Sequence, residues 1–470
     1  MKNTIDKEIE LQIESIGFEG ISIARKDGLV YIVKGGIPGE KVIAVEKRRK
    51  RRYTEASVKE IIEASEYRVE PVCRYFGVCG GCSWQNLHYE QQLYWKRQHI
   101  VDSFRHIAKM VPGEIPGTIP SPLIYNYRNK MEFSFDTSRW LTDEEISAGE
   151  EISCESFALG LHIPGRYDKV LDIEECHLVD DKAILILNDA RNKALAMGLQ
   201  AFNDRIHQGF LKNLVFRNVS SGMTMVILIT TDFTDDADKA FVDWMFNDLR
   251  NNHSISSIVH AVNNSVNTVA TGEIKRIEGE GYLTEDVYGV KFKISPFSFF
   301  QTNSEQLPRF MDSIIELAEF KYSDIVWDLF CGTGAISLLT SGCVKSVIGF
   351  EVSENSIKDA IENAKLNKIV NVEFRCADLN SKNVSKEFEN IPQCDVMVID
   401  PPRAGMHKNL IETILNIAPG RIVYVSCNPA TQARDCGLLS EKYLISKIQP
   451  VDMFPHTYHI ESIAQLNKKS

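Results

Sequence analysis

The sequence lacks any segment suited to a membrane or to secretion. No apolar run approaches the ~18 residues that a membrane-spanning helix needs. The segment from Met1 to Glu10 carries too much charge to act as a secretory signal. We therefore expect a cytoplasmic protein that has no membrane partner.

The sequence also lacks net positive charge. It has 53 Lys and Arg against 64 Asp and Glu, a formal net charge of -11, which argues against indiscriminate binding of polyanions. The balance is uneven, because residues 1–60 hold 13 basic and 10 acidic side chains, a local charge of +3, and the remainder holds -14. A nucleic acid, if bound, is expected to meet the N-terminal segment first.

A disulfide framework is a third absence. Such frameworks belong to small secreted domains, whereas eleven cysteines are spread here over 470 residues, odd in number and partly clustered. Reduced thiols, a metal site and a nucleophile account for them better. A chain of this length exceeds one hydrophobic core, and at ~100 to 200 residues per domain it predicts about three domains.

The first 64 residues alternate apolar and polar side chains in short runs. Asp27-Gly28 separates two of these runs and is a strong hairpin signal. Five short strands within residues 1–64 predict a small closed barrel of the OB-like type, which often binds oligonucleotides. The segment from Lys47 to Arg52, six consecutive cations, is predicted as a loop before the last strand. It is read either as a solvated loop or, on a small barrel, as a contact for nucleic acid.

Cysteines with metal-ligand spacing follow the predicted barrel. Cys73, Cys79 and Cys82 form a C-x5-C-x2-C cluster whose glycines let the backbone wrap closely around a bound centre, and Cys176 is the candidate fourth ligand. Four thiolates are compatible with zinc and with a four-iron cluster, and cysteines without a metal are the alternative. Residues 65–300 are predicted as a central α/β domain that contains this metal segment.

Residues 301–470 alternate buried strands with helices, as in a doubly wound Rossmann-like sheet. Gly332 follows the first strand, Glu351 the second and Asp378 the third, so all three are expected at the carboxyl edge where such sheets bind ligands. The glycine allows close backbone approach, Glu351 suits ribose hydroxyls and Asp378 suits an adenine amino group. The turn lacks the third glycine expected beside a pyrophosphate, which favours S-adenosylmethionine over a dinucleotide.

Two further motifs indicate the reaction. Asp400 opens an Asp-Pro-Pro loop that could present polar groups to a flat substrate, and Cys427 follows the fifth apolar strand. Methylation of an amino group needs no thiol, but pyrimidine C5 becomes nucleophilic only after a group such as a thiolate adds to C6. Glu461 enters from a later loop as a candidate base. His456 and His459 either orient it or serve packing.

These motifs together resemble the RNA uracil-C5 methyltransferase family, in particular its bacterial 23S ribosomal RNA members with a TRAM barrel and a four-iron, four-sulfur cluster. The resemblance covers nearly the whole chain. It is carried by the cysteine cluster, Phe-Phe-Gln-Thr-Asn at 299–303, Asp-Leu-Phe-Cys-Gly-Thr-Gly at 328–334, Asp-Pro-Pro-Arg at 400–403, Ser-Cys-Asn-Pro at 426–429 and His-Ile-Glu at 459–461.

The resemblance implies a role for each matching residue. Cys427 would be the nucleophile and Glu461 the base. The implied cofactor positions are Gln301, Phe330, Glu351 and Asp400, and the implied cluster ligands are Cys73, Cys79, Cys82 and Cys176. Ala335 stands where some relatives have Asn, so no cofactor contact is assigned to it.

The implied partner is 23S ribosomal RNA, with no obligate protein partner evident in the sequence. Three alternatives remain at this stage: the same chemistry on a transfer RNA uridine, an RNA-binding or ribosome-assembly factor without turnover, and a zinc-containing amino methyltransferase that would leave Cys427 idle.

Overall fold

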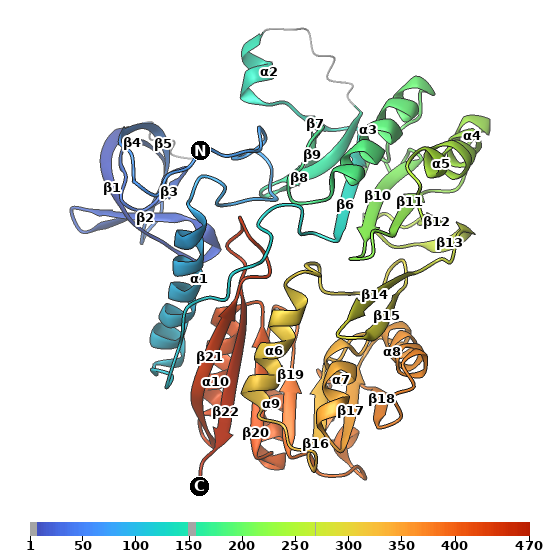
Figure 1. Ribbon diagram of the computed structural model, residues 1–470. Helices are drawn as coiled ribbons and strands as arrows, with labels where there is room; N and C mark the ends of the chain where they lie inside the picture. The colour runs from blue at the N-terminus through green and yellow to red at the C-terminus, as the bar shows by residue number, and fades with distance from the viewer. Residues whose placement is uncertain (1–6, 149–156, 268) are drawn as a thin grey trace.

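The computed structural model of the protein describes residues 7–148, 157–267 and 269–470. Three structural units are visible: an N-terminal barrel, a central sheet covered by helices, and a layered α/β unit that ends at the C-terminus (Figure 1). This multidomain α/β architecture confirms the predicted fold class at that level. None of the helices in the described ranges combines the length and apolarity needed to cross a bilayer.

The N-terminal unit is a closed five-stranded barrel in the order β1-β2-β3-β5-β4. Inward-facing residues such as Leu11 and Ile13 build its small core, as the alternating pattern predicted. Asp27 and Gly28 both have positive φ, as the turn between β2 and β3 requires. The strands are β1 (Glu8–Ile16), β2 (Ser22–Lys26), β3 (Leu29–Lys34), β4 (Lys41–Arg49) and β5 (Thr54–Glu63).

The basic run does not lie wholly in a loop, so that part of the prediction is wrong. β4 continues to Arg49, because its pairing with β5 extends to Arg49 opposite Thr54. Only the segment from Lys50 to Arg52 forms the turn, and all six cations from Lys47 to Arg52 are exposed. The charge therefore follows one rim of the barrel.

The central unit is an eight-stranded sheet in the order β13-β12-β11-β10-β6-β8-β9-β7. Helices α3 (Asp181–Ala196) and α4 (Asp236–Trp244) cover one face, and α4 continues through η3 (Met245–Leu249) and α5 (Arg250–Asn252). The acidic and polar sequence from Trp140 to Glu155 predicts a surface excursion, and residues 149–155 of it lie outside the described residues. The strands are β6 (Lys130–Asp136), β7 (Arg139–Trp140), β8 (Ala158–Ile163), β9 (Arg166–Asp172), β10 (Leu211–Asn218), β11 (Thr224–Thr230), β12 (Ser257–Val262) and β13 (Glu273–Glu278), with α2 (Asp143–Ala148) after β7.

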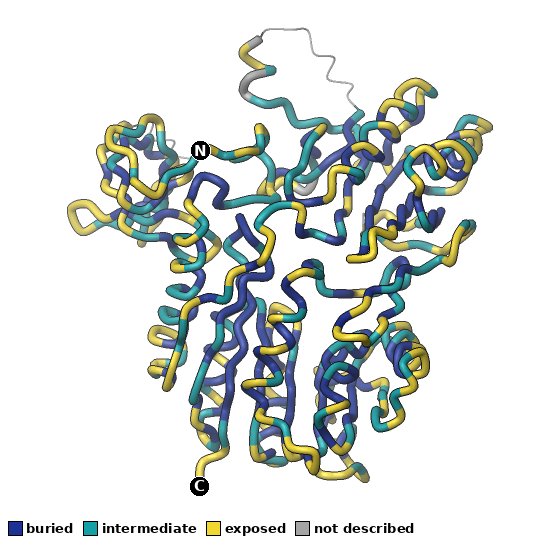
Figure 2. The backbone as a smooth tube through the Cα atoms, in the orientation of Figure 1, coloured by how far each residue is buried: buried dark blue, intermediate teal, exposed yellow. Residues whose placement is uncertain are grey.

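The C-terminal unit is a seven-stranded sheet in the order β18-β17-β16-β19-β20-β22-β21. The first five strands are parallel and β22 is antiparallel to both its neighbours, a difference from a six-stranded dinucleotide fold. All of these strands except the edge strand β18 are buried along most of their length (Figure 2). The strands are β16 (Ile325–Leu329), β17 (Ser346–Glu351), β18 (Val372–Cys376), β19 (Val396–Ile399), β20 (Arg421–Ser426), β21 (Tyr443–Val451) and β22 (Glu461–Lys468).

Helices flank this sheet, and a separate hairpin of β14 (Leu283–Val287) and β15 (Val290–Ile294) packs against it from the central side. Several of these helices begin with a side-chain cap, as where the Ser353 hydroxyl accepts a hydrogen bond from the Ser356 N–H. The helical segments are α6 (Leu307–Ala318), α7 (Ala335–Thr340), η4 (Ser341–Cys343), α8 (Glu354–Leu366), η5 (Val384–Phe388), α9 (Lys408–Ile417) and α10 (Pro429–Leu439).

One long helix does not follow the predicted division into residues 1–64, 65–300 and 301–470. Helix α1 (Tyr89–Ser103), extended by the π-helical η2 (Phe104–Ala108), precedes the central sheet in sequence. Its apolar face, with Ile100 and Phe104 fully buried, packs into the core of the C-terminal sheet beside α10. The C-terminal unit is therefore built partly from residues far upstream.

Candidate active site

A cavity of about 690 Å³ opens at the carboxyl ends of β16, β17, β19 and β20. This is the edge at which an open parallel sheet binds its ligand. The structure brings most of the sequence-predicted side chains to this cavity, whose walls include Gln301, Phe330, Gly332, Glu351, Asp400, Cys427 and Glu461. Gln301 and residues that follow four different strands therefore line the same cavity.

The loop after β16 shapes the floor of the cavity. Phe330 has a φ of 65°, a left-handed conformation that is strained for a bulky residue. The Glu351 carboxylate accepts hydrogen bonds from the Gly332 N–H at 3.3 Å and from the Ser353 N–H at 2.9 Å. Glu351 is therefore fixed at the end of β17, beside the glycine loop. Gly334 has a φ of 85°, and an added Cβ would lie 2.7 Å from the ring of Phe374.

The structure does not bring Asp378 into the cavity. Its side chain is exposed and accepts a hydrogen bond from the Asn380 N–H at 3.0 Å. Its neighbours Ala377, Leu379 and Asn380 form the wall at this point. The third strand thus contributes apolar surface and an amide to the cavity instead of the expected carboxylate.

Cys427 lies at the turn between β20 and α10. Asn428 caps α10, because its side chain accepts a hydrogen bond from the Ala430 N–H at 3.1 Å, and Pro429 occupies the first turn. This cap ends the strand and holds the half-buried thiol at the cavity wall. Burial raises the pKa of Cys427 to about 11, the Glu461 carboxyl adds to the increase, and Arg403 opposes it.

A buried carboxyl group, Glu461, and a half-buried one, Asp400, lie beside this thiol. Glu461, at the start of β22, is 6% exposed, and burial raises its pKa well above the usual range, with a further contribution from Asp400. Burial likewise raises the pKa of Asp400 to about 7. Arg403 lowers the pKa of Glu461 and that of Cys427, so its guanidinium is an electrostatic partner of both the acid and the thiol.

Cys427 also borders a second, smaller cavity of about 150 Å³. Phe18 and Glu19 of the barrel, in the 3-10 turn η1 (Phe18–Gly20), form one wall, and Tyr458 and His459 form another. The Phe18 and Tyr458 rings lie 6.5 Å apart. The thiol can therefore be approached from the barrel side as well as from the large cavity.

The four predicted metal-ligating cysteines line a third cavity, of about 550 Å³. Burial raises the pKa of Cys79 to about 11 and that of Cys82 to about 12, and it also raises the pKa of Cys73 and Cys176. Over the ranges that the structure describes, no three His, Cys, Asp or Glu side chains form a group able to hold one metal ion. The iron-sulfur centre therefore remains a prediction, although its four proposed ligands share one cavity.

Three residues border both the cysteine cavity and the large cavity: Arg128, Phe299 and Thr302. The Nε of Arg128 is buried and has no hydrogen-bond partner. The sequence alone assigned no role at the site to Arg128 or to Arg403. Arg403 directly follows the Asp-Pro-Pro motif, and this position could have indicated that it lies at the site.

Comparison with known proteins agrees with this geometry. A family model described as tRNA (uracil-5-)-methyltransferase matches residues 250–469. An RNA methyltransferase of Bacteroides thetaiotaomicron is 39% identical over 95% of this chain and 99% of its own length. One of Chlorobaculum tepidum is 39% identical over 93% of this chain and 91% of its own.

A solved structure is also similar over almost the full length. The tRNA (uracil-54, C5)-methyltransferase of Pyrococcus abyssi, in complex with S-adenosyl-L-homocysteine, is 27% identical with a TM-score of 0.73, covering 97% of this chain and 100% of that one. With the two close relatives and the matched family model, this similarity extends from the barrel to the last strand. The chain belongs to the RNA (uracil-5-)-methyltransferase family.

Proposed function

We propose that this protein methylates C5 of a uracil in RNA, with S-adenosylmethionine as methyl donor, Cys427 as nucleophile and Glu461 as base. The observation that carries the proposal is the shared cavity. Cys427 and Glu461 line the same cavity as Gln301, Phe330 and Glu351. One cavity can therefore hold the cofactor and the target uracil side by side.

The cofactor side of the cavity suits an adenosyl group. Glu351 is held by two backbone N–H groups and can accept hydrogen bonds from both ribose hydroxyls. Leu379 and the ring of Phe330 offer apolar surface for a purine, and the Asn380 side chain lies at the same wall. The structure that resembles this chain over almost its whole length has S-adenosyl-L-homocysteine bound, which is what remains of the donor after transfer.

The nucleophile acts first. The Cys427 thiol loses its proton to water, and its sulfur forms a bond to C6 of a uracil that has been turned out of the RNA stack. The electron pair of the C5–C6 double bond moves toward C5 and O4, giving an enolate. Arg403, which already lowers the pKa of the thiol, stabilises the thiolate from which this step begins. S-adenosylmethionine supplies the methyl group that C5 then accepts.

Glu461 completes the reaction. The methylated C5 still carries its original hydrogen, which the Glu461 carboxylate removes as a proton. The electrons left behind restore the C5–C6 double bond, and the bond from C6 to Cys427 breaks. A carboxylate whose pKa is raised by burial is a stronger base than one in water, as this step requires.

The proposed target is 23S ribosomal RNA, on the resemblance of the barrel and the cysteine segment to those of the ribosomal members. Exposed cations from Lys47 to Arg52 on the barrel rim would bind phosphates. Transfer RNA is the second candidate, because the matched family model and the Pyrococcus abyssi enzyme are both named for it.

We place a four-iron, four-sulfur cluster at Cys73, Cys79, Cys82 and Cys176. Four cysteines that line one cavity form an all-sulfur donor set, which suits a polynuclear centre in which each thiolate binds its own iron. Uracil methylation transfers no electron, so the cluster would be structural. It would join the segment after the barrel to the central sheet.

The test uses purified protein, labelled S-adenosylmethionine, and unmodified ribosomal and transfer RNA. We expect label at C5 of a single uridine in 23S RNA. Label on an exocyclic amino group would contradict the reaction, and label confined to transfer RNA would favour the second target. Cys427→Ala should abolish both product and covalent adduct, whereas full activity of that variant would refute its assignment.

A further inference from the structure

The loop that leads to Glu461 is held by residues from outside its own sheet. It runs from Asp452, after β21, to Ile460, before β22, and its side chains Phe454 and His459 line the large cavity. Most of the loop is buried, including Asp452 at 0% exposure and His456 at 3%. A buried polar loop needs partners for its backbone and side chains. Several of them come from residues 83–127, and Asn303 adds a hydrogen bond to the carbonyl oxygen of Met453 at 3.1 Å.

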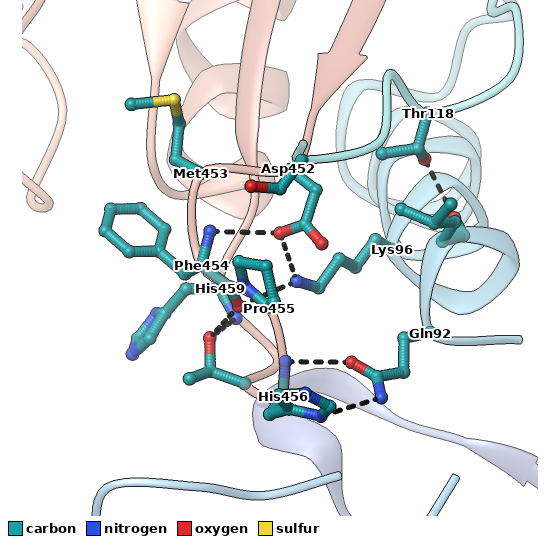
Figure 3. Close-up of polar contacts among 12 residues, drawn as sticks. Gln92, Lys96, Thr118, Asp452, Met453, Phe454, Pro455, His456 and His459 are labelled. Atoms are coloured by element: carbon teal, nitrogen blue, oxygen red, sulfur yellow. Dashed lines mark hydrogen bonds and ion pairs between the residues drawn. The ribbon is translucent and has the colours of Figure 1, made fainter. Parts of the chain in front are cut away.

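The first anchor is a buried ion pair from helix α1. The Nζ of Lys96 lies 2.5 Å from the Oδ1 of Asp452, and both side chains are 0% exposed. Lys96 also donates to the carbonyl oxygen of Phe454 at 2.9 Å (Figure 3). The second oxygen of Asp452 accepts from the Tyr89 hydroxyl at 2.9 Å, and the Phe454 N–H donates to Oδ1 at 3.0 Å.

The second anchor is one helical turn earlier, at Gln92. Its Oε1 accepts a hydrogen bond from the His456 N–H at 2.8 Å, and its Nε2 lies 3.2 Å from the His456 Nδ1 (Figure 3). The carbonyl of His456 accepts from the N–H groups of Ser83 and Trp84, at 2.8 and 3.0 Å. The ring of Tyr125 stacks on the imidazole at 4.3 Å. His456 is thus enclosed from three directions.

A buried ion pair is a poor source of stability. Removing two charges from water is costly, and an apolar pair of similar volume often stabilises a protein equally well. The pair instead fixes geometry, because both side chains can form all of their hydrogen bonds in only one arrangement. Lys96 and Gln92 each bond backbone atoms of the loop as well as a side chain, so they fix the path of the chain toward Glu461.

We propose that Lys96 and Gln92 are positioning residues for proton removal: they hold the loop from Asp452 to Ile460 so that Glu461 faces C5 of the bound uracil. Neither touches the cofactor cavity, and both act through the loop. The proposal rests on the proposed function, in which Glu461 is the base. It gives helix α1 a role in the removal of the C5 proton.

The consequence is a selective defect. Loosening the loop leaves Cys427 and the glycine loop in place, so addition and methyl transfer continue. Proton removal slows, since a displacement of about 1 Å can lower a rate about 100-fold. Protein would then accumulate as a covalent adduct with ordinary uridine RNA, while kcat and KM for the RNA fall together and kcat/KM changes little. A fault in folding alone would lower adduct and product together.

The experiment compares Gln92→Leu and the double variant Lys96→Met/Asp452→Leu with the parent protein. The double variant leaves no unpaired buried charge, so it should still fold, with a melting temperature somewhat below the parent's because Phe454 and the Tyr89 hydroxyl each lose a hydrogen-bond partner. Both variants should show adduct on unmodified RNA in denaturing gels and a product release at least tenfold slower. Arg97→Met is the matched control, because Arg97 is on the same helix but bonds the carbonyls of Ile115 and Pro116.

Glu461→Gln separates this proposal from the function on which it rests. If Glu461→Gln traps adduct but Gln92→Leu and the folded double variant release product at the parent's rate, the positioning role is refuted and the base assignment stands. If Glu461→Gln itself releases product normally, the base assignment fails. Adduct in the two positioning variants, absent from Arg97→Met, supports the proposal.

Discussion

The rate at which Cys427 bonds to uracil should rise steeply with pH. Burial and the neighbouring Glu461 raise the pKa of this thiol from its ordinary value near 9 to about 11. At pH 7.5 about 0.03% of the protein would then carry a thiolate, compared with about 3% for a thiol of ordinary pKa. Deprotonation is favoured as pH rises, so the reactive fraction grows about tenfold per unit until the pKa is reached.

The assay follows covalent adduct formation with RNA that contains 5-fluorouracil. Fluorine at C5 cannot leave as a proton, so the adduct persists and its rate of appearance reports the steps up to methyl transfer. With RNA and S-adenosylmethionine saturating at each point, the rate should increase about 300-fold between pH 6.5 and pH 9. Cys427→Ala, which should form no adduct, provides the baseline.

The same reasoning predicts the effect of replacing Arg403. Its guanidinium lowers the pKa of Cys427, so Arg403→Met should slow adduct formation at every pH below the pKa. Arg403 is exposed and its charge is screened by water, so the loss should stay below about tenfold. A rate that stays flat from pH 6.5 to pH 9 would refute the reasoning, because it would mean that the thiolate is already formed.

Four further predictions concern other parts of the molecule. Glu351→Ala should weaken binding of S-adenosylhomocysteine about 10- to 100-fold in calorimetry; unchanged affinity would remove Glu351 from the cofactor site. Cys176→Ser should lower iron and sulfide in anaerobically purified protein, whereas parent protein with zinc and no iron would exclude the cluster. Arg51→Ala with Arg52→Ala should reduce the salt dependence of RNA binding by about two counterions, and an unchanged slope would show that RNA avoids the rim. Gly334→Ala, with φ at 85° and a phenyl ring 2.7 Å from the new Cβ, should lower the free energy of unfolding by about 1 to 3 kcal/mol in urea, and equal stability would contradict the close packing.

Much of the fold could be predicted from local signals. Alternation of apolar side chains and the Asp27-Gly28 turn identified the barrel, because strand period and turn type are both readable over a few residues. The order of motifs after Ile325 identified the doubly wound sheet. The basic run was placed less well, since strand pairing carried β4 on to Arg49 against the local preference of charged residues for a loop.

The partner of a helix is harder to read than the helix itself. The buried face of α1 is mostly polar, with Gln92, Lys96, His99 and Ser103 beside Ile100, so the sequence does not show that this helix covers the C-terminal sheet. The sequence also did not show which residues hold the loop from Asp452 to Ile460, because these contacts depend on how the helix packs. Lys96 and Gln92 are residue types that are mostly exposed, and only tertiary packing reveals that both are fully buried.

The site shows the same division. The sequence motifs indicated Cys427 and Glu461 as candidate site residues. The structure adds that both line one cavity, which their separation in the sequence could not show. Asp378 was expected in the cofactor pocket from its strand position. Its carboxylate instead bonds the nearby Asn380 N–H, because a short acidic side chain in a turn readily caps its own backbone.

The most direct test of the whole account is to identify the atoms joined when the protein meets RNA containing 5-fluorouracil and S-adenosylmethionine. Mass spectrometry of the digested complex should find a nucleotide bonded through C6 to the peptide that contains Cys427, with a methyl group on C5. Methylated RNA that never becomes attached to the protein, or a nucleotide attached to any other residue, would contradict it.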